Sequence, residues 1–276
     1  MIEDIYYLDE GQVKITAASV VISKQRWISV KEEEISSNKH IELMEKKRFD
    51  HLPIEPAKGI ITEFFKTIEP NNFQNIEKVA IGFEDVIPLD TNIKDVIEKF
   101  AINKRTFYFL TFHRKITGLI TLGNLNCKQV QIYIFSLVCE LERELGDFLN
   151  NCMTNEEIKN WVKSKINVTD AKDKYKFILE NYNGLIESDL ENQLTEQLFL
   201  VDFFKIINEK ELFEKLNFLK CEWKNLDSIN ELRKRIAHPT RNLLDKENNI
   251  YKLKERLNKI EDLTFRLVNH RKNSSR

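Results

Sequence analysis

Two groups of side chains in this sequence have the types and spacing that proton transfer or phosphate binding needs. The first is Arg233 and His238, which are separated by four intervening residues near the end of a predicted helix in the segment SINELRKRIAHPTRNLL. Histidine titrates near neutral pH and can move a proton, and the planar guanidinium of arginine binds phosphate oxygens. The pair therefore has the groups that would transfer a proton and stabilise charge on a phosphate without a metal ion.

The position of Arg233 on its helix adds to this hypothesis. Arg233 follows Ile229 by four residues and precedes Ile236 by three, so it lies on the flank of the apolar stripe. A partly buried guanidinium needs an anion, which is either a phosphate or a carboxylate on a neighbouring helix. His238 also has a second interpretation, because a histidine at a helix C-terminus is favoured by the helix dipole. Both alternatives stay open.

Basic residues are concentrated in the same region. From Leu232 to the end there are 13 Lys and Arg against 5 Asp and Glu, whereas the whole chain has 43 against 44. A polyanion is expected to bind where positive charge is in excess. The candidate polyanion-binding residues beside the pair are Lys234, Arg235 and Arg241, and the last helix adds Lys252, Lys254, Arg256 and Arg266.

The second group belongs to the segment Gly118-Leu119-Ile120-Thr121, which is followed by Asn124. Thr121 ends a predicted strand just before a helix, and the free N–H groups of a helix start attract a phosphate. Asn124 can bond a ribose hydroxyl, and Arg114 in the basic turn before the strand adds positive charge. The candidate ligand-binding residues are thus Gly118, Thr121, Asn124 and Arg114. The alternative for Thr121 is an ordinary helix N-cap.

The elements that position these groups change character near residue 127. Before it, apolar β-branched and aromatic runs predict strands, and two segments between them predict helices. In the second of these helices one apolar face is expected to be buried. The predicted strands are 26–31, 49–54, 58–62, 106–112 and 115–121, the predicted helices are 38–47 and 92–103, and the apolar face comprises Ile93, Val96, Ile97, Phe100 and Ala101.

After residue 127 the pattern is helical throughout. Because no Gly-, Pro- or Ser-rich linker separates the halves, the helix that starts near Cys127 is expected to run from one domain into the other. We therefore predict an α/β domain over 1–128 and an all-α bundle over 129–276. The expected helices are 129–150, 154–166, 170–182, 190–208, 209–220, 222–237 and 249–270.

The N-terminal half also contains an internal repeat. The stretch from His40 to Thr67 aligns with the stretch from Val96 to Asn126 as helix, basic turn, strand, basic turn and a Gly-apolar-apolar-Thr segment. This alignment matches Gly59-Ile60-Ile61-Thr62 with Gly118-Leu119-Ile120-Thr121. It predicts two superposable α/β units, and chance similarity of two small units is the alternative.

The repeated unit, closed by Gly118-Leu119-Ile120-Thr121 and Asn124, resembles a tandem pair of CBS domains over residues 15–128. The resemblance implies that adenosine nucleotides are sensed there, with the hydroxyl of Thr121 on phosphate and Asn124, where Asp is usual, on ribose. In the first repeat Phe65 takes the ribose-binding position, so at most one good nucleotide site is expected. The regulatory ligand it implies is an adenine nucleotide or a cyclic (oligo)nucleotide.

Arg233 and His238, set in a helical domain, resemble the R-x4–6-H motif of the HEPN family. The resemblance implies a metal-independent endoribonuclease, with catalytic Arg233 and His238, whose attacking group is the RNA 2′-OH. It makes Lys234, Arg235 and Arg241 candidate RNA-binding residues. It also implies a homodimer that brings two motifs together, and a role in prokaryotic defence or stress response. Lys234 departs from the polar residue usual after the motif Arg.

Other functional classes lack their motifs. No Walker A, GxGxxG, HExxH, GxSxG or CxxC segment is present, so no cofactor for catalysis and no metal is expected. The spacing of Cys127, Cys139, Cys152 and Cys221 predicts reduced core thiols. The acidic start and the 11-residue run Gln129–Cys139, too short for a bilayer, indicate a cytoplasmic protein with no membrane partner. The favoured hypothesis is a nucleotide-regulated endoribonuclease. The alternative is a non-catalytic, adenine-nucleotide-binding regulator whose helical half mediates dimerisation or partner binding.

Overall fold

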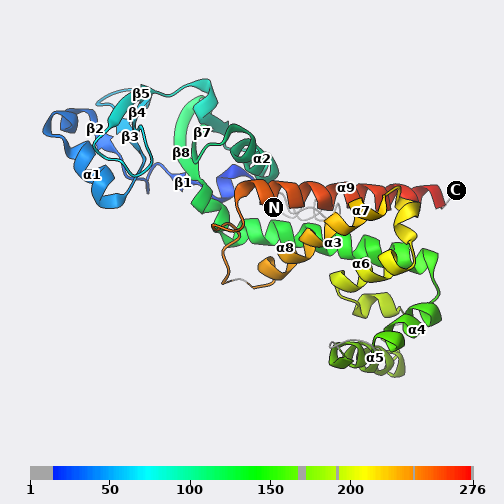
Figure 1. Cartoon of the computed structure of the whole chain (residues 1–276). Helices are drawn as coiled ribbons and strands as arrows, with labels where there is room; N and C mark the ends of the chain where they lie inside the picture. Colours follow the sequence, from blue (N-terminus) through cyan, green and yellow to red (C-terminus); the bar gives the residue numbers. More distant parts are fainter. Residues whose placement is uncertain (1–14, 167–171, 191–192, 239, 275–276) are drawn as a thin grey trace. The chain divides into compact units, whose positions relative to one another are not determined.

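The computed structural model describes residues 15–166, 172–190, 193–238 and 240–274, and they form two compact units (Figure 1). Among the described residues, an α/β unit contains 15–130 together with Leu244–Ile250, and a helical unit contains Gln131–Leu243 and the chain from Tyr251 onward. An α/β N-terminal region followed by a helical C-terminal region was predicted, and the structure confirms it. Residues 1–14, 167–171, 191–192, 239 and 275–276 lie outside the described residues, and with them parts of the helices predicted at 170–182 and 190–208.

The first repeat of the α/β unit is a four-stranded sheet with one helix. Strand β2 (Val30–Lys31) leads through a 3₁₀ segment, η3 (Glu32–Ser37), into α1 (Lys39–Lys47), and β3 (His51–Glu55) returns parallel to β2. Strands β4 (Glu63–Thr67) and β5 (Ile76–Ala80) follow antiparallel. The sheet order is β2-β3-β4-β5.

The second repeat has the same topology. Strand β6 (Val86–Pro88) leads into α2 (Ile93–Asn103), β7 (Phe107–Phe112) returns parallel to β6, and β8 (Lys115–Thr121) pairs antiparallel with β7. The fourth strand is β1 (Ile22–Ser23), which comes from the start of the unit and pairs antiparallel with β8. The order β6-β7-β8-β1 therefore corresponds to β2-β3-β4-β5, as the internal repeat predicted.

The predicted alignment of the two repeats was wrong in register. Thr121 pairs with Phe107 at the start of β7, and the residue that pairs with His51 at the start of β3 is Lys66, not Thr62. The predicted strand 58–62 is a bend, because Gly59 has a φ of 101° and the strand begins only at Glu63. The counterpart of Gly118–Thr121 is thus Glu63–Lys66. Phe65, assigned to a ribose-binding position, is instead a buried residue of β4 stacked on His40.

The core of the α/β unit is formed where the two repeats meet. Phe64 of β4 lies with its ring centroid 5.5 Å from Phe107 and 5.4 Å from Phe109 of β7. Trp27 packs in the same cluster. In α2, all five residues of the predicted apolar face are buried, which confirms that face. This core fixes the facing surfaces of the two repeats.

The helical unit is built on two long helices, α3 (Lys128–Cys152) and α9 (Ile250–Ser274), which are both labelled in Figure 1. Between them the chain forms shorter helices and 3₁₀ turns. These are α4 (Asn155–Ile166), α5 (Lys172–Glu187), η6 (Leu194–Gln197), α6 (Leu200–Glu209), η7 (Leu212–Leu216), α7 (Lys220–Lys224), η8 (Asn225–Asp227) and α8 (Ser228–Ile236).

Several predicted helices are shorter than expected. The helix predicted at 190–208 begins only at Leu200, because Asp202 accepts a hydrogen bond from the N–H of Phe199 and so caps α6. The helix predicted at 209–220 is a 3₁₀ turn flanked by Glu211 and Asn217, which both have positive φ. A left-handed residue ends a helix, so 209–220 cannot be continuous.

The cysteine prediction was partly wrong. All four thiols are free, but Cys139 and Cys221 are exposed and Cys127 and Cys152 are only partly buried, so none is a core residue. Among the described residues, no helix combines the length and apolar content that crossing a bilayer requires.

Candidate functional site

The α/β unit contains a pocket of about 360 Å³ where the two repeats meet, here called the inter-repeat pocket. This is within the range of small-ligand sites, about 300–1,000 Å³. Its walls come from β1 and the segment after it, the turn between α1 and β3, the start of β7 and the end of β8. The lining residues are Ile22, Arg26, Trp27, Ile28, Arg48, Phe49, Asp50, His51, Thr106, Phe107, Leu119 and Thr121.

One wall of the inter-repeat pocket is aromatic. Phe107 and Trp27 are largely buried and therefore fixed in position. The imidazole of His51 lies with its centroid 3.7 Å from that of Phe107, tilted by 35°. The indole N–H of Trp27 donates to Glu55 at 3.2 Å, which holds the ring in place. A rigid aromatic wall of this kind suits a flat heteroaromatic ring.

Two exposed arginines, the imidazole of His51 and the carboxylate of Asp50 set the charge around this wall. Burial lowers the pKa of His51 to about 4, although the nearby carboxylate of Asp50 opposes the shift, so its imidazole is uncharged at neutral pH. Asp50 is occupied through Oδ1, which accepts hydrogen bonds from the hydroxyl of Thr67 and the N–H of Asn71. Arg26 and Arg48 are exposed and line the pocket. The two guanidinium groups can bind an anionic group of a ligand whose ring lies inside.

Of the four predicted ligand-binding residues, only Thr121 lines this pocket. Asn124 accepts hydrogen bonds at Oδ1 from the N–H of Thr121, at 2.7 Å, and from its hydroxyl, at 2.9 Å. These bonds close the start of η5 (Leu122–Asn126). The N-cap alternative therefore describes the position of Thr121 at the start of η5.

Gly118 and Arg114 lie elsewhere on the second repeat. A Cβ at Gly118 would lie 2.4 Å from Cγ2 of Val21 and 2.7 Å from the carbonyl oxygen of Ile22, so the glycine allows β1 to approach β8. Arg114 is in the hairpin turn before β8. At about 3.3 Å per strand residue, the seven residues of β8 place it roughly 20 Å from the Thr121 end. The structure does not bring these residues together with Thr121.

In the helical unit, Arg233 faces a carboxylate. Its Nε lies 3.5 Å from Oε1 of Glu142 on α3, and the two side chains are 33% and 25% exposed. The carboxylate partner left open by the sequence is thus present. The Arg233 side chain as a whole nevertheless stays partly exposed to solvent.

His238 is exposed and follows the end of α8. Its backbone N–H donates to the carbonyl of Arg235 at 3.2 Å, as at a helix C-terminus. Within the described part of the chain, no side-chain hydrogen bond connects His238 with Arg233.

The three predicted RNA-binding residues are held in different ways. Lys234 pairs with Glu231 at 3.0 Å. Arg235 donates to the carbonyl of Asn242 at 2.8 Å, and the carbonyl of Arg241 accepts from Gln131 at 2.9 Å. The backbone after the motif is therefore fixed, while Lys234 and Arg241 have exposed side chains.

Basic residues of the last helix are neutralised by nearby acids. Arg266 pairs with Asp262 at 3.1 Å, and Arg271 lies 3.2 Å from Glu144 and 3.3 Å from Asp147 of α3. The excess of positive charge counted along the sequence is thus smaller at this end of α9.

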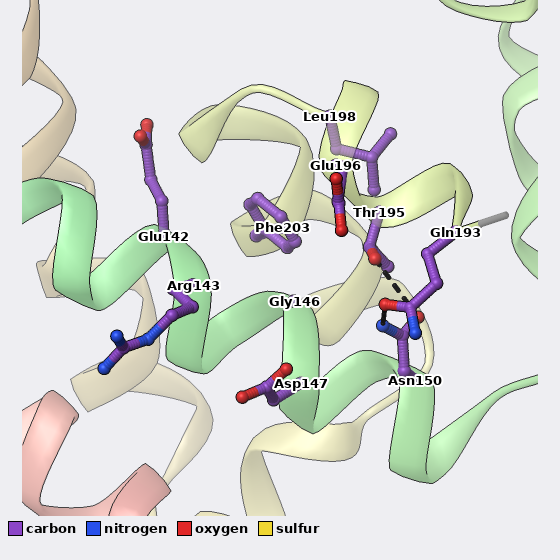
Figure 2. Close-up of a pocket in the computed structure, with 10 residues that line it drawn as sticks. All are labelled: Glu142, Arg143, Gly146, Asp147, Asn150, Gln193, Thr195, Glu196, Leu198 and Phe203. Carbon is purple, nitrogen blue, oxygen red and sulfur yellow. Dashed lines mark hydrogen bonds between the residues drawn. The ribbon is translucent and has the colours of Figure 1, made fainter. Parts of the chain in front are cut away.

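A second pocket, of about 280 Å³, begins at Glu142 and extends along α3 (Figure 2). Its floor includes buried Phe203, and a hydrogen-bond chain joins Asn150 to Gln193 at 2.6 Å and Thr195 to Asn150 at 3.2 Å. Glu142, Asp147 and Glu196 line it together with one basic residue, Arg143. This acidic balance disfavours a phosphate, so it is not an extension of a polyanion site.

No protein-family model matches the chain, and no curated protein matches it. Three similar solved structures are all named as CBS proteins. A complex of CBSX2 with AMP aligns over 42% of this chain and 97% of its own at 15% identity, with a TM-score of 0.33. The CBS domain of a bacterial CNNM/CorC family Mg²⁺ transporter aligns over 45% of this chain and 78% of its own at 11% identity, with a TM-score of 0.29. A hexameric CBS-CP12 protein from bloom-forming cyanobacteria aligns over 61% of this chain and 94% of its own at 12% identity, with a TM-score of 0.30.

Scores and identities this low carry no argument about the function of this chain. The two-repeat topology rests instead on the strand pairings described above.

Sequence reasoning missed most of the inter-repeat pocket. Arg26, Trp27, Arg48 and His51 come from segments read only as strand or turn, and no local motif marks them. Their one shared signal is the clustering of aromatic and basic residues around the predicted strands 26–31 and 49–54. Glu142 carried no signal, because glutamate is common on helix surfaces.

Proposed function

We propose that the α/β unit binds an adenine nucleotide in the inter-repeat pocket and that the chain is a nucleotide-responsive regulator. The observation that carries this proposal is the combination, in one pocket, of a fixed aromatic wall and two exposed arginines. The base would stack against the wall of Trp27, Phe107 and neutral His51, and the phosphate would bind Arg26 and Arg48. Thr121 would contact the ligand from the end of β8.

Calorimetric titration with AMP, ATP and a cyclic di-adenosine nucleotide tests this proposal. At least one of them should bind, and Thr121→Ala should weaken its binding by a few-fold to about tenfold, as expected for one lost hydrogen bond. If no nucleotide in the panel binds the folded protein, the proposal fails.

We also propose a second function, metal-independent RNA cleavage at Arg233 and His238 in a homodimer. What favours it is that Arg233 keeps a third of its side chain exposed despite its carboxylate partner, and that His238 is exposed on the same helix end. His238 would move the proton of the 2′-OH, and Arg233 would stabilise charge on the phosphate. Lys234, Arg235 and Arg241 would contact flanking phosphates.

Incubation of the protein with mixed RNA in EDTA, with and without adenine nucleotides, tests the second function. Cleavage should leave a 2′,3′-cyclic phosphate, and His238→Ala should slow it by about 10²–10⁴-fold. Lys220→Ala, which removes an exposed lysine of α7, is the matched control and should cleave normally. Activity that disappears in EDTA, or an active His238→Ala variant, would leave only the regulatory function.

A further inference from the structure

The Arg233–Glu142 pair has an unusual geometry for an ion pair. Oε1 of Glu142 is buried and accepts no hydrogen bond from any described residue, although Nε of Arg233 is 3.5 Å away. Arg233 therefore neutralises this carboxylate by charge and not through a short hydrogen bond.

Two neighbouring groups oppose the effect of burial on the pKa of Glu142. This glutamate is a residue of the long helix α3, and the backbone N–H of Leu200 at the start of α6 acts on its carboxylate. Burial raises the pKa of Glu142, whereas the charge of Arg233 and the Leu200 N–H lower it in opposition. A carboxylate in these surroundings needs a cation. On α8, that cation is Arg233.

The contact with Glu142 is made on the Nε side of the guanidinium. Nε is the guanidinium nitrogen that lies closest to the carboxylate, so the two terminal nitrogens, Nη1 and Nη2, lie farther from it. These two nitrogens form the edge that binds a phosphate through two parallel hydrogen bonds. The arrangement thus holds one edge of the guanidinium and leaves the phosphate-binding edge for a ligand.

We propose that Glu142 is a positioning residue for Arg233, which holds the guanidinium from α3 so that its terminal nitrogens meet the phosphate of an RNA substrate. This inference rests on the proposed RNA cleavage. It distinguishes Glu142 from a residue that only stabilises the fold, because the two roles predict different kinetics.

Removal of the carboxylate charge has two opposite consequences. The guanidinium loses its orienting partner, so the reacting phosphate is held in the wrong geometry more often and kcat should fall, by about tenfold. At the same time a negative charge next to the phosphate site disappears, so RNA should bind as tightly as before or more tightly. A positioning role therefore predicts a lower kcat with an unchanged or lower KM.

The test compares Glu142→Gln, which keeps the shape of the side chain, with Glu140→Gln on the same helix. Initial cleavage rates over a range of RNA concentrations give kcat and KM, and thermal melting reports whether each variant is folded. We expect the kcat loss in Glu142→Gln only. A Glu142→Gln protein that is folded and has the parent kcat overturns the inference, as does one in which KM rises while kcat stays constant.

The outcome separates the inference from the function on which it rests. A parent protein that cleaves no RNA overturns the proposed cleavage. In that case the pairing is read from the carboxyl carbon signal of Glu142 by NMR, in the parent and in Arg233→Ala. A Glu142 carboxyl that titrates at higher pH in Arg233→Ala than in the parent supports the interaction of Glu142 with Arg233. An unchanged titration overturns that interaction.

Discussion

The substitution Gly118→Ala tests whether this glycine serves the fold or the ligand. The added Cβ would meet Cγ2 of Val21 at 2.4 Å and the backbone oxygen of Ile22 at 2.7 Å. The valine side chain can move aside, but the Ile22 carbonyl belongs to β1, which pairs with β8 at Ile22–Leu119 and Ser23–Gly118. The substitution therefore has to displace a strand of the second sheet.

The expected cost follows from this overlap. Overpacking of a tight site costs about 1–3 kcal/mol. With a urea dependence of about 2 kcal/mol per molar for a unit of this size, the unfolding midpoint should fall by roughly 0.5–1.5 M. The loss should be confined to the α/β unit, because Gly118 belongs to it.

Hydrogen exchange at increasing urea, followed by mass spectrometry of peptides from each unit, measures this change. Gly123→Ala is the matched control, since a Cβ there would meet only the hydroxyl oxygen of Thr121 at an ordinary 3.5 Å. The control should stay within about 0.5 kcal/mol of the parent. If Gly118→Ala unfolds at the same urea concentration as Gly123→Ala, the close approach of β1 is refuted.

Three further predictions concern single side chains. The pKa of His51 is lowered to about 4 in the folded protein, so on acidification the unfolded chain is protonated at a higher pH than the folded one. The α/β unit should therefore lose stability as the pH falls from about 6.5 to about 4. Over that range the urea midpoint of His51→Gln should change less than that of the parent. Asn126→Ala removes two hydrogen bonds to the backbone of Leu244, at 3.1 and 2.6 Å, so the Leu244 amide should exchange about tenfold faster or more, and equal exchange rates would contradict this contact. Asp202 is fully buried and accepts hydrogen bonds from Lys174 at 2.6 Å and from Tyr175 at 3.1 Å. In thermal melting, Asp202→Ala should destabilise the helical unit by about 3–5 kcal/mol. Asp173 is exposed, so Asp173→Ala should melt like the parent.

The strongly periodic elements were predictable from the sequence. The apolar face expected for α2 is buried, and the predicted last helix, α9, also buries residues along one stripe, including Ile250, Leu257 and Leu267. In a helix that buries one face, the apolar residues recur along the sequence with a period of 3.6 residues. The register of the repeats was not predictable in this way, because Gly59-Ile60-Ile61-Thr62 imitates the motif of β8 while its backbone bends at Gly59.

The candidate sites were predictable only in part. The flank position of Arg233 indicated a buried anion as its partner, but the identity of Glu142 depends on the packing of α8 against α3. The inter-repeat pocket brings Trp27, His51 and Phe107 together from three segments, each of which looks like an ordinary strand or turn in isolation. Such a site exists only through tertiary contacts, so no local spacing marks it.

The most direct test of nucleotide binding in the inter-repeat pocket compares two arginines and two ligands by calorimetry. Arg26 lines the pocket, and Arg114 lies in the hairpin turn at the far end of β8. We expect Arg26→Ala to weaken AMP binding by about 10- to 100-fold, as for a lost charge-assisted hydrogen bond. Adenosine, which has no phosphate, should bind the variant and the parent with the same affinity. Arg114→Ala should bind both ligands normally. Equal AMP affinity in the parent and Arg26→Ala, or a loss of AMP binding in Arg114→Ala, would contradict the assignment of this pocket as the nucleotide site.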